Sequence, residues 1–246
     1  MNHGNNTNAN GVVPPASAPF PDVKSLFLFA MSYYIAKLRF NWYVKVQSRL
    51  QKFAGVRSGT TALDYSKAAF TNMNFDTRIF WPMFALCSAP DLKKDSLLIL
   101  GPRFETEIFL ARAIGFRRDG IVAIDTFTYS PLIQSGDMHA LPFQNESLSA
   151  VICGWTLSYS LEPARAADEM SRVLKPGGYV VLAVQKVAPD FVETIPGVLS
   201  GGDRIQTLQQ FDTLFSSLDR VVGFEPHPVG TSSHTLVCYR KPTKTD

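Results

Sequence analysis

The stretch that decides the fold is residues 172–178, which read Arg-Val-Leu-Lys-Pro-Gly-Gly. A helical pattern over residues 164–174 leads into it, and Pro163 stands where the first turn of that helix tolerates proline. The apolar run 179–184 follows it. The prolyl-glycyl-glycine sequence adopts backbone angles that other side chains resist. The stretch therefore predicts a helix, a tight turn and a buried strand.

Strand and helix patterns alternate on both sides of this stretch. We expect strands over 96–100, 120–124, 150–154, 221–224 and 234–239, and helices over 104–114 and 205–217. This order is typical of an α/β fold with a parallel sheet covered by helices. The last two strands are adjacent in the chain, which predicts a closing antiparallel hairpin.

A second motif, residues 136–143, reads Gly-Asp-Met-His-Ala-Leu-Pro-Phe. Together with 172–178 it resembles the class I, Rossmann-like methyltransferases. The resemblance implies a mostly parallel sheet with a C-terminal antiparallel hairpin. It also implies S-adenosylmethionine (SAM) as the cofactor and S-adenosylhomocysteine as the product.

The resemblance assigns cofactor contacts at the ends of the expected strands. Asp125 ends the second strand, where an acid binds the ribose hydroxyls in Rossmann-like units. Asp137 would accept from the adenine amino group, and the backbone N–H of Met138 would meet the ring nitrogen. The alternative for Asp137 is a turn cap. Gly154 ends the expected strand 150–154, and Trp155 begins the loop beyond it. The resemblance implies that this loop faces both the methyl donor and the acceptor.

The loop after the first expected strand departs from the family pattern of three glycines. It reads Gly101-Pro102-Arg103-Phe104-Glu105, so only Gly101 is kept. Three interpretations are open: Arg103 pairs with the methionine carboxylate of the cofactor, Glu105 binds its amino group, or the pocket is remodelled and binding is lost. Glu105 also complements the positive end of a helix. The chain resembles a subset of bacterial methyltransferase-like sequences with this Gly-Pro-Arg loop.

The connection after the second expected strand is also unusual. Only residues 126–137 separate that strand from the adenine-site acid, and a crossover between parallel strands normally needs about a dozen residues or more by itself. We therefore expect the usual helix to be reduced to a turn around Ser130 and Pro131. Its loss would expose one flank of the adenosine pocket.

Two residues are candidates for catalysis. His139 is a natural general base, since the ordinary pKa of histidine is about 6.5; the alternative is a loop residue satisfied by the backbone. Tyr159, with Trp155, would line the acceptor pocket; the alternative is core packing.

We expect O- or N-methylation of a small-molecule, glycan or secondary-metabolite acceptor in a biosynthetic pathway. The alternative is a methyltransferase-like binding or scaffold subunit without transferase activity.

The composition limits the remaining possibilities. A net charge of +3 on 246 residues does not favour nucleic-acid binding. Cys87, Cys153 and Cys238 are too dispersed to predict a disulfide framework or a metal site. No apolar run reaches the ~18 residues of a membrane span, so we expect a cytoplasmic protein.

Three regions are expected along the chain. Residues 1–21 form a disordered tail, 22–94 a helical extension or lid, and 95–246 the methyltransferase-like domain. The helix expected over 23–53 is rich in aromatic residues, and no acid occurs between Asp22 and Asp64. It is interpreted as a helix packed over the domain. Contact with anionic lipid, with an anionic substrate or with a protein partner, and a homodimer, are the open alternatives.

Overall fold

The computed structural model describes residues 23–52, 77–89, 91–186, 204–225 and 234–243. The tail expected over 1–21 lies outside these residues. The helices are α1 (Val23–Phe40), α3 (Thr77–Cys87), α4 (Thr106–Ala113), α5 (Pro163–Val173) and α6 (Leu208–Leu214), with the short helical turns η1 (Asn41–Val46), η2 (Arg118–Gly120) and η3 (Leu157–Tyr159). The strands are β1 (Gln51–Lys52), β2 (Leu97–Leu100), β3 (Ile121–Asp125), β4 (Phe127–Thr128), β5 (Gln134–Ser135), β6 (Leu148–Gly154), β7 (Leu174–Gln185), β8 (Asp219–Phe224) and β9 (His234–Arg240).

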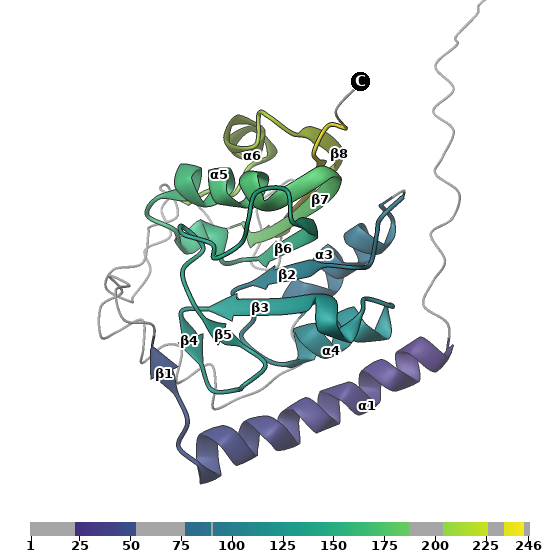
Figure 1. Ribbon diagram of the computed structural model, residues 1–246, viewed down its shortest axis with the longest axis vertical. Helices are drawn as coiled ribbons and strands as arrows, with labels where there is room; N and C mark the ends of the chain where they lie inside the picture. The colour runs from purple at the N-terminus through teal and green to yellow at the C-terminus, as the bar shows by residue number, and fades with distance from the viewer. Residues whose placement is uncertain (1–22, 53–76, 90, 187–203, 226–233, 244–246) are drawn as a thin grey trace, which may run out of the picture.

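Seven strands form the central sheet in the order β5-β3-β2-β6-β7-β9-β8. The first five are parallel, and β9 pairs antiparallel with both β7 and β8. Helices α1, α3 and α4 lie on one side of the sheet and α5 and α6 on the other (Figure 1). This arrangement confirms the predicted Rossmann-like fold with a closing hairpin and an N-terminal helix.

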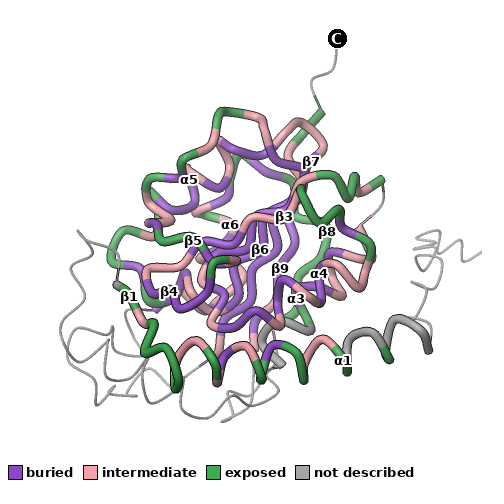
Figure 2. Tube along the Cα trace, turned by 60° about the horizontal axis from the view of Figure 1, so that its bottom comes forward, coloured by how far each residue is buried: buried purple, intermediate pink, exposed green. Residues whose placement is uncertain are grey.

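The core consists of two layers because β2 is buried on both faces. Leu97 and Ile99 pack into the cluster beneath α3 and α4, while Leu98 and Leu100 pack into the cluster beneath α5 and α6. The buried segments accordingly run through the middle of the molecule in Figure 2. This continuous apolar core holds the strand ends in fixed positions.

Several predicted boundaries differ from the structure. The helix expected over 23–53 is wrong at its C-terminal end: it becomes a π-helix at Asn41–Val46, and residues 51 and 52 form strand β1. The turn expected at 175–178 is absorbed into β7, where a register shift against β6 takes up the extra residues and Gly177 has a φ of 77°. No described helix is long and apolar enough to cross a membrane.

The connection from β3 to β5 is as short as predicted. Residues 126–133 contain no helix; instead Thr128 Oγ1 donates to the carbonyls of Ser130 and Ile133 at 3.1 and 2.6 Å. Strand β4 within this connection pairs antiparallel with β1 of the N-terminal extension. The extension therefore contacts the connection from which the usual helix is missing.

Helix α1 packs on the domain through its C-terminal turn. The buried ring of Phe40 makes edge contacts with Phe104 at 5.5 Å and with Tyr129 at 5.2 Å between centroids. Phe104 belongs to the loop after β2 and Tyr129 to the short connection after β3. As expected, the helix lies against the domain, and the ring contacts of Phe40 fall on the two segments that depart from the family pattern.

Candidate functional site

The candidate site lies where the direction of the sheet reverses. From β2 the chain proceeds outward to β3 and β5, and then returns to the other side of β2 to form β6 and β7. Ligands of open α/β sheets bind at such a switch point, outside the carboxyl ends of the strands. Four predicted site segments meet this edge: Gly101 after β2, Asp125 at the end of β3, Asp137 after β5 and Trp155 after β6.

Gly101 is required by its own neighbours. Its φ is 68°, and a Cβ at this position would lie 1.9 Å from Oγ1 of Thr156. Its N–H donates to the carbonyl of Ile124 at 2.9 Å. Pro102, the next residue, is buried. The one retained glycine therefore has a structural reason that is independent of any cofactor.

Glu105 points into the protein and forms a buried ion pair. Its carboxylate is 0% exposed and accepts from Nε and Nη2 of Arg39 at 2.6 and 2.9 Å, and from the hydroxyl of Ser130. These bonds raise the pKa of Arg39. The backbone N–H of Glu105 donates to the hydroxyl of Tyr129, whose pKa is raised mainly by burial. A contact between Glu105 and the cofactor amino group would require this pair to break.

The other charged residue of the loop, Arg103, is partly exposed and precedes α4. Its pairing with a cofactor carboxylate remains a prediction.

Asp125 ends β3 with its side chain partly exposed. Its Oδ1 accepts the backbone N–H of Phe127 at 2.9 Å and the hydroxyl of Thr126 at 3.4 Å. These bonds fix the carboxylate at the tip of the strand, the position predicted for ribose binding. The ribose contact itself remains a prediction.

Asp137 is the first member of a hydrogen-bonded chain. Its Oδ1 accepts the backbone N–H of His139 at 2.9 Å and contacts His139 Nδ1 at 2.5 Å, while His139 Nε2 lies 2.7 Å from Ser160 Oγ. Because a carboxylate can only accept, a neutral His139 carries its proton on Nδ1 and accepts from Ser160. Both ring nitrogens are thus engaged, so proton uptake from an acceptor would require Ser160 to move aside.

The same three groups occur in the nucleophilic triads of hydrolases. Ser160, however, is only 3% exposed, and its oxygen accepts the backbone N–H of Glu162 at 3.1 Å. A nucleophile needs access to its substrate. We therefore interpret the hydrogen bonds from Asp137 through His139 to Ser160 as a brace that orients Asp137, the adenine-site carboxylate of the predicted site.

A second brace, which the sequence did not reveal, connects the Asp137 loop to α5. Glu169 accepts the N–H of Leu141 at 2.7 Å and pairs with Arg172 at 2.7 and 2.8 Å, and these bonds lower the pKa of Glu169. Arg172 also donates to the carbonyls of Leu141 and Phe143. The only sequence signal was the spacing of three residues between opposite charges on one helix.

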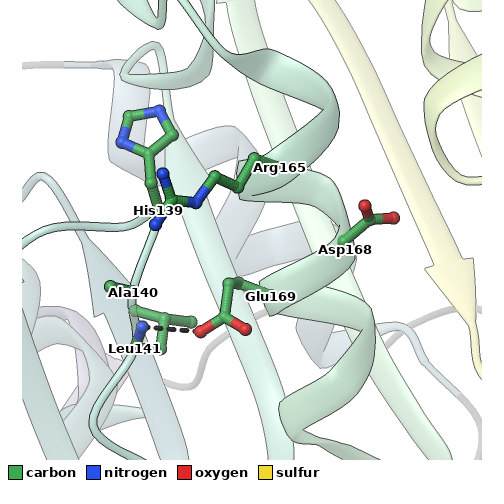
Figure 3. Close-up of a pocket in the computed structure, with 6 residues that line it drawn as sticks. All are labelled: His139, Ala140, Leu141, Arg165, Asp168 and Glu169. Atoms are coloured by element: carbon green, nitrogen blue, oxygen red, sulfur yellow. Dashed lines mark hydrogen bonds between the residues drawn. The ribbon is translucent and has the colours of Figure 1, made fainter.

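A cavity of about 390 Å³ opens beside this brace. It is lined by His139, Ala140, Leu141, Arg165, Asp168 and Glu169. In Figure 3 Glu169 turns toward Leu141, whereas Asp168 points away from the loop. The cavity thus lies between the loop and α5.

Aromatic side chains stand on the β6 side of the site. Trp155 has a φ of 58°, and its indole stacks on His234 with centroids 4.9 Å apart and planes 3° from parallel. Tyr159 is partly exposed, and the guanidinium of Arg204 lies 5.0 Å from the centre of its ring. No motif surrounds His234 or Arg204 in the sequence, so these two contacts were not predicted. The catalytic role of Tyr159 remains a prediction.

A second cavity, of about 460 Å³, lies on the flank where the usual crossover helix is missing. It is bordered by Arg112 of α4, Val122 of β3 and Leu132 of the short connection. Its lining includes Arg118 and Asp119, before the amino end of β3, and neither Asp125 nor Asp137, so the exposure of one flank of the adenosine pocket remains a prediction.

The residues at the strand ends fit the adenosine half of SAM better than its methionine half. Asp125 and Asp137 provide acceptors at the positions predicted for ribose and adenine, with the backbone of Met138 beside them. At the methionine half, Thr156 fills the space beside Gly101, and Glu105 is engaged with Arg39. Within the described residues, no group of three or more His, Cys, Asp or Glu side chains could hold a metal ion.

Comparisons with known proteins match part of this chain to methyltransferases. Residues 119–182 match a family model described as a methyltransferase domain. Over 48 residues the chain is 44% identical to the biotin biosynthesis bifunctional protein BioHC of Teredinibacter turnerae. That match spans 20% of this chain and 8% of the length of BioHC, so it covers only a small part of the relative.

Solved structures show the same fold at low sequence identity. The 1,6-didemethyltoxoflavin-N1-methyltransferase of Burkholderia thailandensis, solved with its substrate and S-adenosylhomocysteine, superposes with a TM-score of 0.54 at 11% identity, covering 78% of this chain and 95% of that one. A SAM-dependent methyltransferase of Aquifex aeolicus gives 0.52 at 12% identity, covering 74% and 99%. The fold prediction is confirmed, and the matched domain supports the predicted SAM-dependent methyltransferase with SAM as its cofactor. The Gly-Pro-Arg subset remains a prediction.

Proposed function

We propose that this chain transfers the methyl group of SAM to an oxygen or nitrogen atom of a small-molecule acceptor. The observation that carries the proposal is the pair of oriented carboxylates at the switch point, Asp125 at the end of β3 and Asp137 after β5. Each is held by hydrogen bonds from the residues that follow it. Preorganised acceptors of this kind bind hydroxyl and amino groups without a reorganisation cost.

The task of the protein in this reaction is mainly alignment. SAM, when bound, supplies an electrophilic methyl group on sulfur. The lone pair of the acceptor forms the new bond to carbon while the carbon–sulfur pair remains with sulfur, and the proton of the acceptor leaves to water or to a base. His139 can take that proton only if its bond to Ser160 opens.

The acceptor would lie on the β6 side, against Trp155 and Tyr159. His234 covers one face of the Trp155 indole and Arg204 lies over the Tyr159 ring, so the acceptor would meet the remaining ring surface, which suits a small cyclic or aromatic molecule. The similar Burkholderia enzyme acts on 1,6-didemethyltoxoflavin, which is a small molecule. This likeness supports a small-molecule acceptor, and the classes proposed for it are secondary metabolites and glycans.

Calorimetric titration with S-adenosylhomocysteine tests the proposal. The full chain should bind, and Asp125→Ala should weaken binding at least about tenfold, because a charged acceptor contributes about 1.5–3 kcal/mol. Asp119→Ala is the matched control: this exposed aspartate stands just before β3, at the opposite end of the strand. Equal affinities of the wild type and Asp125→Ala would contradict the ribose assignment.

A second candidate function is a binding or scaffold subunit without transferase activity. Two observations at the methionine half of the predicted SAM site favour it. Glu105 is buried against Arg39, and the loop keeps one glycine where the family has three. The same titration separates the two. Absence of binding at millimolar S-adenosylhomocysteine would favour the scaffold and overturn the enzyme.

A further inference from the structure

Helix α1 and the π-helix that continues it carry a row of large apolar side chains that face away from the domain. Figure 2 shows α1 along the edge of the molecule, with exposed segments along its length. We call these residues the exposed stripe: Phe27, Met31, Tyr34, Ile35, Leu38, Trp42 and Val46. Leu38 is 70% exposed and Trp42 54%. Exposed apolar side chains are ordinary when scattered, but a contiguous set marks an interaction site.

The spacing of the stripe follows the helix. At about 100° per residue, the five members from Phe27 to Leu38 fall within an arc of about 100°. Trp42 and Val46 continue the row at intervals of four residues through the π-helix. Ala36 and Phe40 are buried against the domain on the opposite side. The helix therefore has two apolar faces, and the domain accounts for only one of them.

The charge around the stripe is of one sign. No acidic residue occurs between Asp22 and Asp64, whereas seven basic residues do. Arg39 is engaged by Glu105, but Lys37, Lys45 and Arg49 are exposed. A second copy of this face would set these cations against one another, with no acid on the helix to compensate. An anionic surface would be complementary to them.

We propose that the exposed stripe docks the protein on the surface of an anionic lipid bilayer. The helix lies parallel to that surface, its apolar side chains enter the boundary between headgroups and acyl chains, and the flanking lysines contact lipid phosphates. Tyr34 and Trp42 have the amphipathic rings that favour this depth. Docking does not depend on methyl transfer, and it goes beyond the proposed function.

The position of α1 gives docking a consequence for the site. Arg39 and Phe40 contact Glu105 and Phe104 from the side of the helix that faces the domain. The loop after β2 is thereby attached to the same helix that meets the bilayer. A docked molecule would hold its candidate cofactor loop close to the membrane surface, where an acceptor of low solubility would be concentrated.

Sedimentation of the full-length protein with vesicles tests the proposal. Vesicles of phosphatidylcholine mixed with phosphatidylglycerol should carry the protein down, and pure phosphatidylcholine should bind it more weakly. Replacing Leu38 and Trp42 together by serine should weaken binding about a hundredfold, since each buried large side chain contributes about tenfold or more. Phe224→Ser is the matched control, because Phe224 is 58% exposed on β8 and lies outside the stripe.

Charge and fold are controlled separately. Lys37→Glu with Lys45→Glu should weaken binding to the anionic vesicles at least about tenfold and leave binding to pure phosphatidylcholine unchanged. Urea unfolding should give the same midpoint for the Leu38/Trp42 variant and the wild type, since both side chains are exposed.

Three results would overturn the proposal. The first is a wild type that stays in solution with anionic vesicles. The second is a serine variant that sediments as well as the wild type. The third is a wild-type dimer in size-exclusion chromatography that the serine variant converts to a monomer without any vesicle binding, which would make the stripe an interface between copies.

Discussion

Replacement of Arg39 by methionine is the sharpest test of how the N-terminal helix is attached. Glu105 is fully buried, and its carboxylate depends on Arg39 for the neutralising charge and for two hydrogen bonds. Methionine has a similar length and no charge. Arg39→Met therefore leaves a buried carboxylate with only the hydroxyl of Ser130 as a side-chain donor.

The magnitude follows from the burial of the two partners. Breaking a fully buried ion pair costs about 3–5 kcal/mol, because one charge stays desolvated and unpaired. The side chain of Arg39 is 33% exposed, so water can reach the vacated position and reduce the cost to about 2–3 kcal/mol. For a chain of this size, that corresponds to a Tm lower by about 4–12 °C.

Urea unfolding of the full chain, followed by circular dichroism, measures this effect. The double variant Arg39→Met/Glu105→Gln should return to within about 1 kcal/mol of the wild type, because the neutral amide can still accept from Ser130. Lys37→Met is the control, since it removes an exposed cation from the same helix. If Arg39→Met unfolds within about 0.5 kcal/mol of the wild type, the ion pair does not anchor the helix.

Two further predictions concern the two ends of β2. Gly101→Ala should lower the free energy of unfolding in urea by at least about 2 kcal/mol, because the new Cβ would clash with Thr156 and the φ of residue 101 is positive. Adding Thr156→Gly should remove the clash and leave only the ~1–2 kcal/mol cost of the positive φ. A Gly101→Ala variant as stable as the wild type would refute the packing argument. At the other end, burial acts to raise the pKa of Asp95, but hydrogen bonds from Ser149 and Lys175 outweigh it and hold the pKa at about 2. Asp95→Asn should therefore lower the free energy of unfolding by at most about 1 kcal/mol at pH 7, since the side chain is 44% exposed. The difference between variant and wild type should shrink as the pH falls from about 4 toward 2, because the wild-type carboxylate becomes protonated in that range. A difference that is constant with pH would contradict this assignment.

The sequence was sufficient for the parts of the fold that depend on local pattern. The short apolar run of β2 and the spacing after Asp125 predicted a buried parallel strand and a crossover without a helix, and both are present. The α-helix predicted from apolar spacing was wrong at Asn41–Val46. The apolar spacing continues there, but the backbone widens to a π-helix and then enters β1. The pairing of β1 with β4 decides that boundary, and it joins residues more than 70 positions apart.

The site was predictable in its positions and much less so in its contacts. Asp125 and Asp137 stand at strand ends because the sheet topology places them there. Whether Glu105 faced a cofactor or the protein depended on Arg39, which is 66 residues away and offered no local signal. The same holds for Thr156, whose side chain occupies the space beside Gly101. Such contacts arise from tertiary packing, and a single sequence does not specify them.

The two departures from the family pattern meet the N-terminal helix in one cluster of contacts. Glu105 replaces a loop glycine and pairs with Arg39 of α1. Tyr129 and Ser130 belong to the shortened crossover; Tyr129 accepts the backbone N–H of Glu105, and Ser130 donates to its carboxylate. Phe40 closes the cluster from the helix. Without Arg39, the buried carboxylate of Glu105 would lower the stability of the fold. The ring of Phe40 packs on the part of the chain where the crossover helix is absent. The altered loop, the short crossover and the N-terminal helix are therefore parts of one arrangement, in which removing any member leaves a buried charge or an exposed apolar surface.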